Sequence, residues 1–193
     1  MIRRLAREVA LQALFQIDFT GNEVEQAVDA ALDEHEELHP EAAVDKALDQ
    51  HKELGAASAR NYVKKYSMVL VNGVVENKEA IDATLNSCAT DWTVERMPAT
   101  DRNILRVAVF EMRHEKPALA AGVAINEAVE IAKAYGTDES AKFVNGVLGR
   151  IARQTQLPAD AAFDAALTPR VDESADETDS DDPIVLDTTD MDD

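Results

Sequence analysis

The sequence contains a single cysteine, Cys88, and no long apolar run. One cysteine excludes an intramolecular disulfide and a zinc site built from several cysteines, and it fits a reducing compartment. No segment approaches the roughly 20 apolar residues that cross a bilayer, and the amphipathic N-terminus does not resemble a signal peptide. We therefore expect a cytoplasmic protein that makes no membrane contact.

Signatures of catalysis and of β-structure are also missing. The sequence has no G-x-x-x-x-G-K-[ST] loop, no G-x-G-x-x-G after a strand and no G-x-S-x-G elbow. It shows no period-2 alternation, and its Asn145-Gly146 pair lies inside a helical pattern rather than between strands. We therefore expect an all-α protein that is not an enzyme and needs no cofactor.

The net charge of -19 is concentrated in two segments. Residues 154–193 hold thirteen acids and one base, a net of -12, and residues 23–54 hold eleven acids and two bases, a net of -9. The rest of the chain is therefore close to neutral, at +2. A strongly acidic protein repels phosphate, but here that argument against a nucleic-acid partner applies to the two acidic segments alone.

Helical periodicity divides most of the chain into amphipathic segments. A Gly136 in left-handed conformation is expected to end the helix predicted at 123–135, and residues 92–96 are expected to form a further turn. Residues 154–193 are too polar to bury a core, which predicts a disordered acidic tail. The predicted helices cover residues 1–19, two marginal stretches within 23–54 separated at His39-Pro40, 58–77, 78–89, 100–115, 123–135 and about 137–153.

The string His35-Glu36-Glu37-Leu38-His39 matches the H-E-x-x-H pattern of zinc hydrolases. In that pattern two histidines one helical turn apart bind zinc and the glutamate activates water. The match lies in a weakly hydrophobic, Glu-rich segment next to Pro40, where nothing predicts the rigid support that a catalytic metal needs. We favour a chance match and expect no metal site.

Two groups of cations point instead to nucleic acid. Arg3, Arg4 and Arg7 crowd the first two turns with Glu8 as their one nearby acid in sequence, so free guanidinium groups are expected there. On the last helix, Phe143 borders a basic strip formed by Lys142, Arg150 and Arg153. This arrangement suits single-stranded RNA, because bases can stack on the aromatic ring while the cations bind the phosphates. The alternatives, a solvated helix end and an inward-packed Phe143, are about equally consistent with spacing.

A further basic stripe lies on one helix face at Arg102, Arg106 and Arg113. We expect these side chains to be solvated or held in salt bridges, with Glu95 or Asp101 as partners.

Several strings, taken in order, resemble the NusB family. They include Arg3-Arg4-Leu-Ala-Arg7-Glu8, Trp92-x-x-x-Arg96-Met97 and Asp101-Arg102-x-Ile104-Leu105-Arg106. The most specific are AINEAVEIAK at 124–133 and KFVNGVL at 142–148. The resemblance covers residues 1–22 and about 58–153, which leaves residues 23–57 as an acidic helical insertion and 154–193 as the tail of a domain spanning 1–153.

The resemblance implies two packed three-helix bundles plus a short extra helix. It implies a transcription antitermination factor that binds boxA-type single-stranded RNA of ribosomal RNA leaders with the small-subunit ribosomal protein NusE, and then joins the RNA polymerase complex. In this family the residues matching Arg3, Arg4, Arg7, Lys142 and Phe143 face RNA. The positions matching Phe15 and Asp101 are partner contacts, which would explain why Leu11 and Phe15 lie on an otherwise charged side of the first helix.

Two other functions stay open at this point. The same fold can serve as a protein-interaction module or homodimer with little RNA affinity of its own, and the zinc hydrolase remains a remote third reading. The acidic tail also suggests a mimic of RNA that weakens nonspecific binding at the basic surface.

Overall fold

The computed structural model describes residues 2–38, 56–89, 92–115, 118–137 and 139–154. Within these ranges all regular structure is helical and no strand occurs, which confirms the predicted fold class. None of the described helices is long and apolar enough to span a membrane. The elements are α1 (Ile2–Thr20), α2 (Val24–Leu38), α4 (Ala56–Glu76), α5 (Lys78–Cys88), the 3-10 helix η1 (Val94–Arg96), α6 (Ala99–Arg113), α7 (Ala121–Tyr135) and α8 (Ser140–Gln154).

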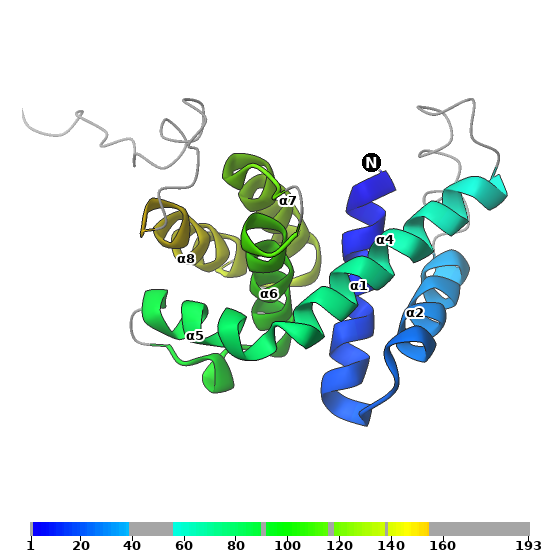
Figure 1. The fold of residues 1–193 in the computed structure, drawn as a ribbon, viewed down its shortest axis with the longest axis horizontal. Coiled ribbons are helices and arrows are strands. Elements are labelled where there is room, and N and C mark those ends of the chain that lie inside the picture. Colours follow the sequence, from blue (N-terminus) through cyan, green and yellow to red (C-terminus); the bar gives the residue numbers. More distant parts are fainter. Residues whose placement is uncertain (1, 39–55, 90–91, 116–117, 138, 155–193) are drawn as a thin grey trace, which may run out of the picture.

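The helices form two packed groups (Figure 1). In the first group α1, α2 and α4 pack against one another, and in the second α6 packs against α7, α8 and the shorter α5. Both α1 and α4 also contact α6, so the two groups share one continuous core. Gly73 of α4 permits part of this contact, because the ring of Phe110 on α6 fills the space that a Cβ at Gly73 would need. The expected pair of bundles with an extra helix is confirmed.

Helix α2 is a core element rather than an addition to the domain. Gly21, with φ of 69°, turns the chain between α1 and α2 in the left-handed region that glycine adopts without strain. Along α2 the side chains at helical spacing are fully or nearly fully buried against α1 and α4: Ala27, Val28, Ala31 and Leu32. The interpretation of 23–57 as an insertion therefore needs correction over 24–38. Residues 39–55, with the second marginal helix, lie outside the described residues.

Most helix ends fall within two or three residues of the predicted positions. Gly136 ends α7 as predicted, but its backbone, with φ of -101° and ψ of -158°, is extended rather than left-handed. A Cβ at Gly136 would lie 2.5 Å from the Cβ of Ser140, so the glycine is needed for close contact with the start of α8. Of the predicted acidic tail, 154–193, Gln154 is the last residue of α8, and residues 155–193 lie outside the described residues.

Candidate nucleic-acid interface

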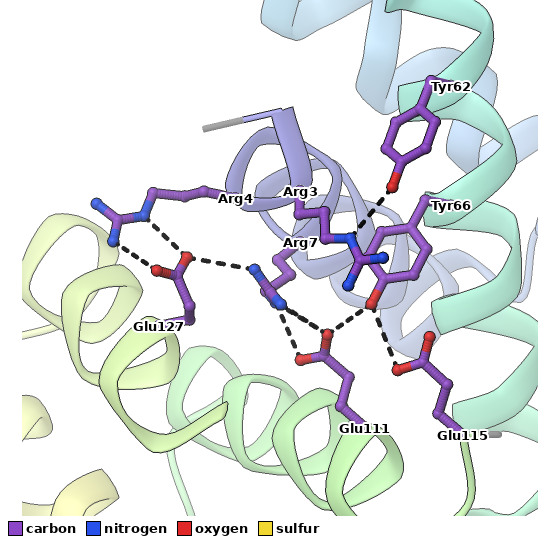
Figure 2. A network of polar contacts seen from close by, with 8 residues as sticks. All are labelled: Arg3, Arg4, Arg7, Tyr62, Tyr66, Glu111, Glu115 and Glu127. Atoms are coloured by element: carbon purple, nitrogen blue, oxygen red, sulfur yellow. Dashed lines mark hydrogen bonds and ion pairs between the residues drawn. The ribbon is translucent and has the colours of Figure 1, made fainter. Parts of the chain in front are cut away.

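Arg7 is the centre of a polar network that joins both helix groups (Figure 2). Its Nε donates to both carboxylate oxygens of Glu111 on α6 at 3.0 Å, and its Nη1 donates to Glu127 on α7 at 3.2 Å. The Tyr66 hydroxyl on α4 donates to Glu111 at 2.8 Å. Arg7 and Glu111 are almost fully buried, so this ion pair is part of the core of the junction between the bundles.

Arg4 and Arg3 extend the network towards the surface (Figure 2). Arg4 makes a two-point contact with Glu127, with its Nε at 3.1 Å and Nη2 at 2.9 Å from the two carboxylate oxygens. The Arg3 Nε donates to the hydroxyl of Tyr62 at 3.1 Å, and its guanidinium lies over the Tyr66 ring, 5.3 Å from the centroid. All three arginines therefore have partners, and the expectation that they are free is wrong.

The pKa values of the network follow from burial and charge. Burial alone would raise the pKa of Glu127, but the hydrogen bond and charge of Arg4 outweigh it and lower that pKa. Burial raises the pKa of Glu115, and the nearby charge of Glu111 raises it further. Burial together with Glu111 also raises the pKa of the Tyr66 hydroxyl, which therefore stays protonated as a donor.

The partners of the arginines were not identified from sequence. Glu111 and Glu127 lie 104 and 120 positions from Arg7, so no local spacing connects them. The carboxylate of Glu127 falls within the AINEAVEIAK string, on what sequence periodicity treats as a solvent-facing side. The structure also places Arg7, with 4% of its surface exposed, where its guanidinium cannot reach an RNA in this conformation. The structure therefore gives no support to a direct RNA contact by Arg7 and shows its side chain held by Glu111 and Glu127.

The second predicted surface lies on α8. Lys142 is highly exposed and pairs locally with Glu139 at 3.1 Å. Phe143 is partly buried against the core, and its ring lies 6.0 Å from that of Trp92 at an interplanar angle of 60°. Trp92, 45% exposed, was not identified from sequence as a member of this surface. Arg150, further along the predicted strip, donates from Nη1 to the carbonyl oxygen of Cys88 at 3.0 Å.

Two of the three arginines in the α6 stripe, Arg102 and Arg106, form salt bridges, as one of the two expectations proposed, whereas Arg113 donates to the hydroxyl of Thr84 at 2.9 Å. Arg102 binds Asp18 at 2.9 Å, and Arg106 makes a two-point contact with Asp82 at 2.9 and 2.8 Å. The expected partners were wrong, since Asp18 comes from α1 and Asp82 from α5. These contacts join α1 and α5 to α6.

The predicted partner residues separate into core and surface. Leu11 is 5% exposed and lines a small apolar cavity with α6 and α7 residues, so it belongs to the core and its predicted partner contact is corrected. Phe15 is 43% exposed and its ring lies 4.6 Å from that of the more exposed Phe19. Asp101 is buried in the first turn of α6. The next residue, Arg102, binds Asp18 near the end of α1.

The described part of the chain holds no group of three potential metal ligands. In the H-E-x-x-H string, His35 is buried, with its Nε2 3.3 Å from a carboxylate oxygen of Glu8. His39 lies outside the described residues. His35 thus joins α2 to α1, and what is described of the string gives no support to the zinc reading.

Comparisons with known proteins agree on one family. The model of the NusB family matches residues 4–153. Transcription antitermination protein NusB of Bdellovibrio bacteriovorus is 41% identical over 151 residues, covering 78% of this chain and 95% of that protein. The protein of the same name from Bacillus cereus is 42% identical over 152 residues, covering 78% and 97%.

Solved structures of similar fold include T. maritima NusB, with a TM-score of 0.59, 33% identity and coverage of 79% of this chain and 91% of that chain. A crystal structure of antitermination factors NusB and NusE in complex with dsRNA is similar with a TM-score of 0.59, 25% identity and coverage of 79% and 97%.

Proposed function

Because this chain belongs to the NusB family, we propose that it is a transcription antitermination factor that binds boxA-type single-stranded RNA together with the ribosomal protein NusE. The observation that carries this proposal is the family match over 4–153, which includes α1 from Arg4 onward and α8 as far as Arg153. A similar NusB has been crystallised with NusE and dsRNA. The proposed function contains no catalytic step and belongs in the bacterial cytoplasm, where the complex would join RNA polymerase.

We assign the RNA surface to Arg3 and Arg4 on α1 and to Lys142 and Phe143 on α8. Helix α7 supports this grouping because it packs along α8 and, through Glu127, also holds Arg4 (Figures 1 and 2). An RNA strand that crosses α7 would therefore meet cations at both of its sides. Arg7 lies buried beneath this surface and supports it by forming ion pairs with Glu111 and Glu127.

We assign the NusE contact to the end of α1 and the start of α6. The exposed Phe15 offers an apolar contact, and exposed aromatic side chains of this kind are enriched at protein interfaces. Asp101 lies in the neighbouring first turn of α6, although little of it is exposed. Phe15 follows Arg4 by eleven residues, about 16 Å along α1, so the proposed RNA and NusE contacts lie at separate places on the helix.

One observation favours a second function, that of an interaction module or homodimer with little RNA affinity. Each arginine of the α1 cluster already has a partner within the protein, so RNA must compete with those contacts. NusE could then contribute much of the affinity for RNA.

The test is binding of a labelled boxA RNA and of a scrambled RNA, each with and without NusE. Wild type is compared with Arg3→Ala/Arg4→Ala and with the control Arg60→Ala/Lys64→Ala, which removes the same charge from α4. Partner-enhanced, sequence-selective binding that is lost in the first variant and kept in the control supports the antitermination function. Weak and equal binding to both RNAs, unaffected by NusE, moves the function to the interaction module, which sizing of the pure protein then examines.

A further inference from the structure

An aromatic pair, an exposed glycine and two cations lie on one side of α8 or beside it. Trp92, 45% exposed, lies beside the partly buried Phe143. Gly146 follows Phe143 by three positions, and this spacing puts both residues on one helix face. Lys142 and Arg153 are exposed on the same side of α8 by helical projection. An aromatic pair, an opening over the helix backbone and cations thus occur together.

Contacts with the described residues do not explain why position 146 is a glycine. Among the described residues, no atom lies within 4 Å of a Cβ built there, and the residue is exposed within a regular helix. Glycine in such a position weakens a helix relative to alanine. By contrast, Gly73 and Gly136 are each required by a close neighbour, Phe110 and Ser140 respectively. The open space at Gly146 is therefore suited to a ligand that approaches the backbone of α8.

We propose that Trp92 and Gly146 are further RNA-binding residues, at which one base of a single-stranded RNA stacks on the Trp92 ring while the strand crosses α8 over Gly146. This inference rests on the proposed function and extends its RNA surface beyond Lys142 and Phe143. Indole rings bind bases of any sequence through stacking, and the flanking cations hold the adjoining phosphates. RNA is favoured as the occupant because the exposed aromatic surface is bordered by cations of α8.

Trp92 is the one tryptophan of the chain, so its fluorescence reports on this place directly. The full chain is titrated with unlabelled boxA RNA and, separately, with inorganic polyphosphate. Stacking predicts that RNA quenches the emission and that polyphosphate, which has no bases, does not. Equal quenching by both ligands overturns the proposal, because the signal would then report charge alone.

Variants make the assignment specific. Trp92→Ala is expected to weaken binding of labelled boxA RNA about tenfold, and Trp92→Phe, which keeps an aromatic ring, by about threefold or less. Gly146→Ala is expected to weaken RNA binding while thermal stability is unchanged or raised, an opposite pair of effects that a purely structural role does not produce. Circular dichroism checks that each variant keeps its helices.

Failure of this inference can be separated from failure of the proposed function. If wild type binds RNA, but its fluorescence does not change and all three variants bind equally well, Trp92 and Gly146 lie outside the site. The proposed function then stands. If wild type binds no RNA with or without NusE, both the function and this inference are overturned.

Discussion

Arg7 of α1 and Glu111 of α6 form an ion pair with 2.9 Å between Nη2 and Oε1, in which the side chains are only 4% and 1% exposed. Burial disfavours a charged guanidinium, but the hydrogen bond and charge of Glu111 outweigh this, so the pKa of Arg7 is raised. Tyr66 adds a third helix by donating to the same carboxylate. The cluster that first suggests RNA binding therefore also fastens α1 to α4 and α6.

Arg7→Met is expected to lower the free energy of unfolding by about 3 kcal/mol, because it leaves the Glu111 carboxylate buried without its counter-charge. Chemical denaturation followed by circular dichroism measures the loss. Lys133→Ala, which removes an exposed pair with Glu130, serves as the control and should leave stability unchanged. Equal stability of Arg7→Met and wild type would contradict the role assigned to this pair.

Glu127→Gln is expected to tighten binding of boxA RNA about three- to tenfold at low salt, because the carboxylate competes with phosphate for Arg4. Filter binding or anisotropy of labelled RNA measures it. The matched control is Glu130→Gln, which removes the same charge from α7 where the carboxylate pairs with Lys133 and acts on Arg4 through charge alone, less strongly than Glu127 does. In an Arg4→Ala background the gain should disappear. Weaker binding by Glu127→Gln would mean that Glu127 orients Arg4 for RNA rather than masking it.

The positions of the helices could be predicted from the sequence better than the contacts between them. Periodicity of 3.6 residues located most helix ends and the basic side of α8, because these depend on residues close in the chain. It gave little weight to α2, whose buried face contains two alanines, Ala27 and Ala31, that pack closely although their hydrophobic signal is weak. Alanine-rich faces of this kind become recognisable only once the facing helices are known.

Ion-pair partners could not be predicted for the same physical reason. Arg106 binds Asp82, 24 positions away, and Arg4 binds Glu127, 123 positions away. Such pairings depend on how helices pack, and no periodicity within one helix contains that information. An arginine cluster in sequence therefore indicates charge, but whether the charge is available to RNA depends on carboxylates elsewhere in the chain.

Protonation of Asp18 in acid is expected to lower the free energy of unfolding. Burial alone would raise the pKa of Asp18, but hydrogen bonds from Arg102 and Asn103 outweigh it and lower that pKa below its ordinary value. A lowered folded-state pKa contributes stability that is present above the unfolded-state pKa, about 4, and lost as the pH falls through the folded-state value. Asp18→Asn should therefore cost stability at pH 7 and progressively less below about pH 4. Urea denaturation across this range measures it, and a pH-independent cost would contradict the assignment.

Phe15→Ala is expected to weaken NusE binding about tenfold without loss of stability, because the ring is 43% exposed and lies at the proposed interface. Leu11→Ala, on the same helix, should instead lower the free energy of unfolding by about 3 kcal/mol, because Leu11 is in the core. Calorimetric titration with NusE and thermal melts separate the two effects. Reversed results, with Phe15→Ala unstable and binding normally, would remove Phe15 from the interface.

Deletion of residues 155–193, which leaves α8 intact, is expected to tighten RNA binding, and most strongly at low salt. The segment carries thirteen acids and one base, so we expect it to compete with RNA phosphates for the cations of α1 and α8. Screening by salt weakens both interactions, and the advantage of the deletion should therefore shrink as ionic strength rises. A full-length variant with the thirteen acids changed to Asn and Gln separates charge from chain length. If that variant binds like wild type while the deletion binds more tightly, bulk rather than charge limits access to the RNA surface.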